Sequence, residues 1–354
     1  MISISGNTEL LVHQKLYKEG VKVMTLDIKS VDIKPKRETF GHVARRIGEG
    51  KSATRYEEAT YDLQAVTNFH YRPTYNPKYE IYDTNKTAIK MEDWYKFLDP
   101  RQYYYSNYVM TRAKQQEVAE QNFVFVEKRG LLNAMPNDIK EQILNHVLPL
   151  RHYEWGANMN NLQLVSESYG AAYASAAMFH AEDRLGNAQY ITRIGLLLGE
   201  NEASFLDHAK DLWLNEPSWQ GLRKAMEDSF VIEDWFELHL VQNVIMDGFI
   251  HPLFFNAYEQ EINSKGGTAQ GMMSEFITTW YEETTKWTDK TILVASSESQ
   301  ENSEILTTWA KKYIDVIEKA TLPLAQNLVS NSDEVVSEIK QNLIDRLNKN
   351  GLSI

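Results

Sequence analysis

The histidines are the residues whose spacing bears most directly on catalysis. In a bundle of long helices, a di-iron carboxylate centre uses glutamates from four helices and two Glu-x-x-His pairs, whose spacing turns both ligands inward. None of the nine histidines has an acidic residue three positions before it. The sequence therefore predicts no di-iron centre of this kind.

Two His-x-Glu pairs could begin another kind of iron site, with two histidines and one carboxylate. They are His152 with Glu154, and His180 with Glu182. On a helix, residues two apart point about 200° away from each other, so one metal ion is poorly placed to meet both. We interpret both pairs as ordinary polar or buried helical residues.

The sequence lacks the residues that several other kinds of catalytic or binding site require. The chain has no cysteine, which excludes disulfides, thiolate zinc sites, iron–sulfur clusters and cysteine nucleophiles. The segment GEGKS at 48–52 comes nearest to a phosphate-binding loop, but Arg45 occupies the position of the required first glycine. There is neither a Gly-x-Ser-x-Gly elbow nor a His-Glu-x-x-His helix.

Charge and hydropathy limit the partners. With 37 basic and 49 acidic residues the net charge is −12, which disfavours nucleic acid and leaves proteins as the expected partners. No apolar run approaches the roughly 20 residues that span a bilayer, and the first residues lack the basic and apolar regions of an export signal. We expect a cytoplasmic protein that does not contact a membrane.

The elements that position the histidines are predicted to be helices. Apolar residues recur at helical spacing nearly throughout the chain after Val109, and the stretch 167–198 is rich in alanine, as in a central bundle helix. The last helix has one apolar face. The predicted helices cover 112–128, 137–150, 167–198, 219–261, 271–295, 301–328 and a segment around 335–347.

The preceding part of the chain has a different pattern. Eleven of the 19 tyrosines lie between Tyr56 and Tyr108, among prolines and with little helical periodicity. Such aromatic residues must cover either the chain's own helices or a partner. We predict a variable extension (1–33), an extended subunit-contacting arm (34–108), an all-α domain (109–330) and a C-terminal amphipathic helix (331–354).

Several segments carry a resemblance to a known family. They are YEEATYD (56–62), TNFHYRP (67–73), TAIKMEDW (87–94), DPRQYYY (99–105) and EDWFEL (233–238). In these segments the sequence resembles the hydroxylase β subunits of bacterial multicomponent monooxygenases, most of all the phenol hydroxylase branch. The resemblance covers roughly residues 34–330 and implies a ferritin-like helical bundle.

The same resemblance implies the partners and cofactors. A β subunit of this kind carries no cofactor and pairs with a di-iron α subunit and a γ subunit, commonly as α2β2γ2. A reductase with FAD and a 2Fe-2S cluster supplies electrons from NADH, and an effector protein couples them to aromatic hydroxylation. The implied interface residues in the arm are Asn68, Phe69, His70, Tyr71, Arg72, Trp94, Arg101, Tyr103, Tyr104 and Tyr105.

Comparison with the α-subunit pattern also implies where the iron site was lost. Glu182 and Leu185 resemble the first Glu-x-x-His pair, Lys290 and Leu293 resemble the second, and Ala157 falls near another ligand. Leucines in place of imidazoles predict a centre packed with hydrocarbon. A buried Glu182 would need a cation, for which Arg184 and Lys290 are the candidates.

Three alternatives to a phenol-type structural subunit remain. The chain could be the β subunit of a toluene-type monooxygenase, or a catalytic di-iron oxygenase with atypical ligands. A third possibility is a stand-alone binding or storage bundle, which would leave the aromatic arm unexplained. The missing Glu-x-x-His pairs disfavour the catalytic alternative.

Overall fold

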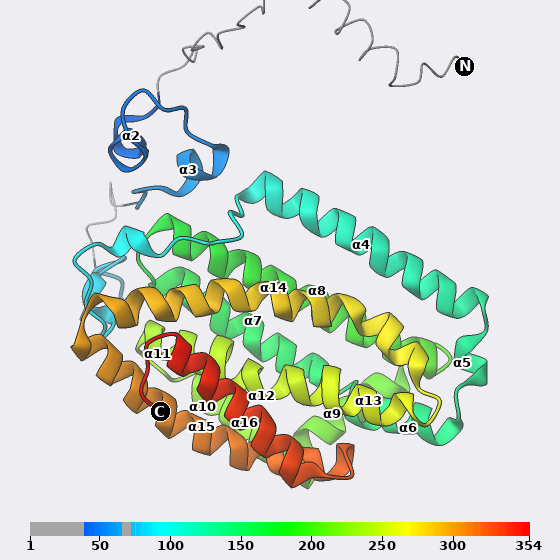
Figure 1. Ribbon diagram of the computed structural model, residues 1–354. Coiled ribbons are helices and arrows are strands. Elements are labelled where there is room, and N and C mark those ends of the chain that lie inside the picture. Colours follow the sequence, from blue (N-terminus) through cyan, green and yellow to red (C-terminus); the bar gives the residue numbers. More distant parts are fainter. Residues whose placement is uncertain (1–38, 66–71, 75) are drawn as a thin grey trace, which may run out of the picture. The chain divides into compact units, whose positions relative to one another are not determined.

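The computed structural model describes residues 39–65, 72–74 and 76–354, and all regular elements in these ranges are helices (Figure 1). The first part, up to Tyr104, contains only short helices. A capping box starts α3, since the Thr54 side chain and the Glu57 side chain each accept from the other's backbone N–H. The short helices are α2 (Gly41–Ile47), α3 (Arg55–Thr60) and the 3-10 turns η1 (Thr84–Lys86) and η2 (Trp94–Lys96).

From Tyr105 onward the chain is helical almost without interruption. The predicted helices over 271–295 and 301–328 are confirmed as α14 and α15. Among the described residues, no helix is long and apolar enough to cross a membrane. The helices are α4 (Tyr105–Lys128), α5 (Leu131–Ala134), α6 (Asn137–His146), α7 (Leu150–Glu167), α8 (Ala171–Leu198), α9 (Ser204–Asn215), α10 (Pro217–Ser229), α11 (Trp235–His239), α12 (Asp247–Pro252), α13 (Tyr258–Asn263), α14 (Thr268–Glu298), α15 (Gln300–Leu328) and α16 (Ser332–Lys349).

One predicted helix is wrong in its extent. The segment 219–261 was expected to be continuous, but the chain leaves the helical conformation between Ser229 and Trp235. The new helix starts at Asp234, whose side chain accepts from the backbone N–H groups of Phe236 and Glu237. An N-cap aspartate of this kind satisfies donors that the first turn leaves free.

From Trp235 to Asn263 the helix is continuous but contains two π-helical segments. These are η3 (Leu240–Met246), between α11 and α12, and η4 (Leu253–Ala257), between α12 and α13. Pro252 precedes η4 and supplies no backbone N–H, which weakens the α-helical pattern there. π-helical turns are rare and often accompany functional sites. All seven residues of η3 are buried, so this segment lies inside the bundle.

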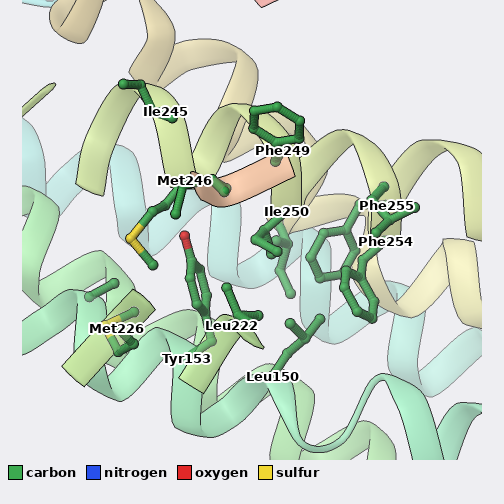
Figure 2. Close-up of a cluster of buried hydrophobic side chains, with 14 of the residues drawn as sticks. Leu150, Tyr153, Leu222, Met226, Ile245, Met246, Phe249, Ile250, Phe254 and Phe255 are labelled. Carbon is green, nitrogen blue, oxygen red and sulfur yellow. The ribbon is translucent and has the colours of Figure 1, made fainter. Parts of the chain in front are cut away.

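The centre of the bundle lies where α7, α8, the 235–263 helix and α14 pack together. Figure 2 shows the apolar side of this centre, where Leu222 and Met226 of α10 meet α7 and the 235–263 helix. There the ring of Tyr153 extends from α7 toward the helix that carries Met246 and Ile250. Its hydroxyl group therefore reaches the polar part of the centre.

The segment that precedes α4 is fastened to the helices by specific bonds. Asn302, at the start of α15, accepts from the backbone N–H of Lys90 (2.9 Å) and donates to its carbonyl (2.7 Å). Asp234 accepts from the N–H of Ala88 at 2.7 Å. The Trp94 ring packs against Trp235, with centroids 6.0 Å apart. This part of the predicted arm thus covers the chain's own body.

Candidate functional site

The most unusual group in the bundle is the side chain of Arg184, which is fully buried in the middle of α8. One guanidinium nitrogen, Nη1, lies 3.2 Å from each carboxylate oxygen of Glu154 on α7. It is also 3.2 Å from Nε2 of His251 on α12. The other nitrogen, Nη2, donates to Asp247 of α12 and lies 3.2 Å from Nε2 of His180.

Further side chains hold the two carboxylates in place. Tyr153 donates its hydroxyl to Asp247 (2.7 Å), and Gln242 of η3 lies 3.3 Å from the same oxygen. Asn187, one turn after Arg184, approaches Glu154 at 3.4 Å. The centroid of the Trp280 ring on α14 lies 4.7 Å from the central carbon of the Arg184 guanidinium. Side chains from all four central helices therefore surround Arg184. We call Arg184, Glu154, Asp247, His180 and His251 the central cluster.

Burial governs the ionisation of the central cluster. Desolvation raises the pKa of Glu154 to about 7 and also raises that of Asp247, although the charge of Arg184 opposes both shifts. Burial alone would lower the pKa of Arg184, but the two carboxylates outweigh it and hold the arginine charged. The cluster therefore contains one firm positive charge and two carboxyl groups, of which Glu154 readily takes a proton.

The two histidines are neutral. Burial lowers the pKa of His180 and of His251 well below the ordinary value, and the nearby Arg184 charge adds to this. Their Nε2 atoms face a guanidinium, which can only donate. Their Nδ1 atoms have no hydrogen-bond partner among the described residues. The two carboxylates and the two imidazole nitrogens therefore surround one positive charge, which is the Arg184 guanidinium.

A second charged group joins α4 to the bundle. Arg112 of α4 donates to both oxygens of Asp183, at 2.8 and 2.7 Å, and to Glu283 at 3.1 Å. Tyr108 and the indole N–H of Trp280 donate to the same aspartate, at 2.8 and 2.9 Å. Trp280 thus contacts Arg184 through its ring and Asp183 through its nitrogen, which connects the two groups.

The predicted positions of the lost iron site are wrong for four residues. Glu182, Leu185 and Lys290 are exposed on the outside of α8 and α14, and Leu293 is half-buried. On α8, Glu182 points about 200° away from Arg184, which explains its exposure. Only Ala157 is buried in the bundle.

The inward pair of α8 with three-residue spacing is Arg184 and Asn187, both of which contact Glu154. The predicted centre of packed hydrocarbon is therefore wrong, because polar groups fill it. Nor does Arg184 compensate Glu182, since it pairs with Glu154 and Asp247 instead. Asp247 and His251 are four residues apart, a spacing that also places two side chains on one face of a helix but differs from the three-residue spacing of an iron-binding pair.

The candidate interface residues divide into three groups. Asn68, Phe69, His70 and Tyr71 lie outside the described residues. Trp94, Arg101 and Tyr103 are largely used within the chain: Arg101 pairs with Asp99 at 2.9 Å, and Tyr103 donates to Glu283 at 2.8 Å. These contacts hold the three side chains against the chain's own helices, and their predicted interface role stays a prediction. Arg72 and Tyr105 are exposed and Tyr104 is half-buried, so an interface role for these three remains a prediction.

Comparison with known proteins identifies the family. The family model described as Methane/Phenol/Alkene Hydroxylase matches residues 72–299. The oxygenase component DmpL of phenol 2-monooxygenase from Pseudomonas sp. (strain CF600) is 43% identical over 329 residues, which cover 93% of this chain and 98% of that protein. The chain belongs to this hydroxylase family. The predicted resemblance is thereby confirmed.

One solved structure supports the same family and the fold, and a more distant relative is similar in sequence. Phenol hydroxylase from Pseudomonas sp. OX1 matches with a TM-score of 0.86 and 40% identity, over 93% of this chain and 99% of that one. The β subunit of the toluene-4-monooxygenase hydroxylase of Ectopseudomonas mendocina is 21% identical over 67% of this chain and 72% of that protein. The predicted all-α, ferritin-like fold class is confirmed.

The described residues of this family member do not fit the di-iron centre that the resemblance implies for the partner subunit. The Arg184 guanidinium lies among the carboxylates and imidazoles, and Asn187 follows it where the iron-binding pattern has a histidine. No group of three or more His, Asp or Glu side chains in the described ranges is arranged to hold a metal ion.

Proposed function

We propose that this chain is the non-catalytic β subunit of a multicomponent phenol-type monooxygenase. Its role is to hold a di-iron partner subunit, which hydroxylates aromatic rings with O2 and electrons derived from NADH. The observation that carries the proposal is Arg184, whose positive charge lies at the bundle centre in contact with Glu154 and Asp247. The near-complete overlap with a phenol 2-monooxygenase component supports it.

The outer face of α7 and α8 supports an assembly role. Trp155 is 55% exposed and Met159 is 44% exposed, one turn apart on α7. Exposed Leu162 continues this line, and Met178 and Leu185 lie on the outside of α8. We call these five residues the outer apolar face. Contiguous apolar surface of this kind is characteristic of protein interfaces.

Contacts between the two helices place these residues at matching levels along α7 and α8. Asn158 donates to the carbonyl of Ala181 at 2.8 Å, which sets α7 and α8 antiparallel with residue 158 level with residue 181. Leu162 therefore lies near the level of Met178, and Trp155 near that of Leu185. Glu182 is the exposed charged residue of α8 within this stretch, since Asp183 and Arg184 are buried. We propose that the di-iron subunit, a helical bundle of the same fold, packs here.

The remaining features of the assembly rest on the family resemblance. They are a γ subunit in an α2β2γ2 hydroxylase, an effector protein, and a separate reductase with FAD and a 2Fe-2S cluster. A toluene-type system is the alternative. The 43% identity to a phenol 2-monooxygenase component, against 21% to the toluene-4-monooxygenase β subunit, favours phenol as the substrate class.

Sedimentation of the purified chain with its di-iron partner tests this proposal. We expect one complex heavier than either chain, and hydroxylation of phenol once reductase and effector are added. The double variant Trp155→Asp, Met159→Asp should weaken the complex, because two charges would be buried at the interface. The control is Val316→Asp on α15, where the native residue is also 44% exposed. A wild-type chain that sediments alone beside its partner would refute the assembly role.

A further inference from the structure

The polar groups around Arg184 have the composition of a metal-binding set. Two carboxylates and two imidazoles, from α7, α8 and α12, all point at one cation. We propose that Arg184 closes a latent divalent-cation site: Glu154, His180, Asp247 and His251 are able to bind one ion, and the guanidinium excludes it. This inference goes beyond the proposed function, because it depends only on contacts inside this chain.

The protonation of the donors suits a metal ion. The Nε2 atoms of His180 and His251 both lie 3.2 Å from nitrogens of the guanidinium. A guanidinium can only donate hydrogen bonds, so each Nε2 atom must be the unprotonated nitrogen of its imidazole and must accept with its lone pair. That is the form of imidazole that binds metals, and it is already directed at the centre of the cluster.

The spacing of His251 from the two carboxylates is also close to that of metal ligands. In a tetrahedral site with bonds of about 2.1 Å, neighbouring ligand atoms lie roughly 3.4 Å apart. Nε2 of His251 is 3.5 Å from an oxygen of Glu154 and 4.0 Å from an oxygen of Asp247. As they stand around Arg184, these side chains do not form a metal site. Without the guanidinium, movement of the four side chains toward one another would provide two nitrogen and two oxygen ligands, which suits Zn²⁺, Co²⁺ or Fe²⁺.

The guanidinium prevents this in the native chain. Its nitrogens occupy the space between the donors, and its charge repels a second cation. Removing it would leave Glu154 and Asp247 buried without a cation, which is costly. A divalent ion bound at this place would compensate the two negative charges. Arg184 thus keeps a metal ion out of the centre of the native chain.

Titration of the full-length Arg184→Ala variant with cobalt(II) chloride tests the inference. We expect one equivalent of Co²⁺ to bind, with visible absorption bands of a site coordinated by nitrogen and oxygen. At a hundredfold excess over Kd, the metal should raise the Tm of the variant by roughly 4 °C. The wild-type chain should show neither the bands nor the shift.

Two further variants separate a built site from a general effect of losing a buried arginine. Arg112→Ala removes another largely buried arginine between two carboxylates, Asp183 and Glu283, and no histidine in the described part of the chain is hydrogen-bonded to it. This control should be destabilised without binding cobalt. Adding His251→Ala to Arg184→Ala should weaken cobalt binding by at least about tenfold.

If Arg184→Ala does not fold in metal-free buffer, refolding with and without cobalt(II) replaces the titration. Recovery of folded protein that holds one equivalent of cobalt supports the inference. A variant that cobalt neither binds nor rescues overturns it. Equal cobalt binding by Arg112→Ala would also overturn it, because the ion would then not depend on the two imidazoles.

Discussion

At the scale of single residues, Arg184 determines what its neighbours can do. Its charge opposes the desolvation of Glu154 and Asp247, and its N–H groups occupy the Nε2 lone pairs of two histidines. The two carboxyl groups are not equivalent. Asp247 receives further hydrogen bonds from Tyr153 and Gln242, whereas Glu154 has only a long contact with Asn187 besides Arg184 and its proximity to His251.

This difference leads to a prediction for two isosteric variants. Burial raises the pKa of Glu154 to about 7, so at pH 7 ionisation of this carboxyl favours the unfolded chain, and Glu154→Gln should leave the free energy of unfolding unchanged or raise it. Asp247→Asn removes the charge that is closest to Arg184 and should cost about 3–5 kcal/mol. Urea unfolding at pH 7 measures both values. Equal costs would contradict the assigned roles.

Acid should destabilise the chain through its buried histidines. Burial lowers the pKa of His152 to about 4 and that of His239 to about 3. Between pH 6.5 and pH 4 the unfolded chain therefore binds protons that the folded chain does not, and stability falls as the pH falls. Glu154, with its raised pKa, acts in the opposite direction between pH 7 and 4.5. We expect Tm to fall from pH 6.5 to 4.5.

The contribution of His152 can be isolated by substitution. His152→Gln should show a smaller fall in Tm over the same pH interval, because one of the sites that protonate only in the unfolded chain is gone. Scanning calorimetry of the two proteins at pH 6.5, 5.5 and 4.5 makes the comparison. An identical fall in both would show that His152 does not titrate as its burial requires.

At the scale of elements, helix contacts depend on particular glycines. On α10, Gly221 faces α15 so closely that a Cβ atom would lie 2.9 Å from the Cα of Ala320. Gly221→Ala should therefore push two backbones apart and cost about 1–3 kcal/mol. Gly186 of α8 has nothing within 4 Å of its Cβ position.

Gly186→Ala is thus the matched control for the isolated chain. It should gain about 0.5–1 kcal/mol, because alanine loses less backbone entropy in a helix than glycine. Thermal unfolding of the isolated chain gives the sign of the stability change for each of the two variants. Two changes of the same sign would show that α10 and α15 are not held as closely as the structure places them.

The positions of the helices could be predicted from the sequence better than the side of each helix that faces the core. The periodic segments at α14 and α15 are long and apolar on one side, so their existence followed from the pattern. The break before Trp235 also had a local signal, the capping aspartate Asp234, which the apolar run after it obscured. The π-helical segments had none, because they depend on packing within the bundle.

The inward face of α8 was not predictable from periodicity. Small and apolar residues lie all around this helix, so Glu182 and Arg184 were equally plausible as the inward charge. Only the packing of α7 and α12 against α8 decides that Arg184 points inward. The absence of an iron-binding pair was predictable from the histidine spacing, whereas the arginine that fills the centre was not.

At the scale of the whole molecule, the central cluster and the outer apolar face have different roles. The central cluster closes the middle of the bundle with the chain's own cation, and the outer apolar face on α7 and α8 remains available for a partner. Although α7 and α8 carry both features, the central cluster is buried and the outer apolar face is exposed, so changes at the centre and at the interface should be separable. Arg184→Ala should alter metal binding, whereas Trp155→Asp should alter assembly.

The metal content of this chain, separated from a hydroxylase complex assembled in iron-rich medium, tests the central claim most directly. We expect every iron ion of the complex to be recovered with the partner subunit and none with this chain. The reason is that Arg184 occupies the space between the only central carboxylates and imidazoles that the described residues bring together. One or two iron ions bound to this chain would contradict the account.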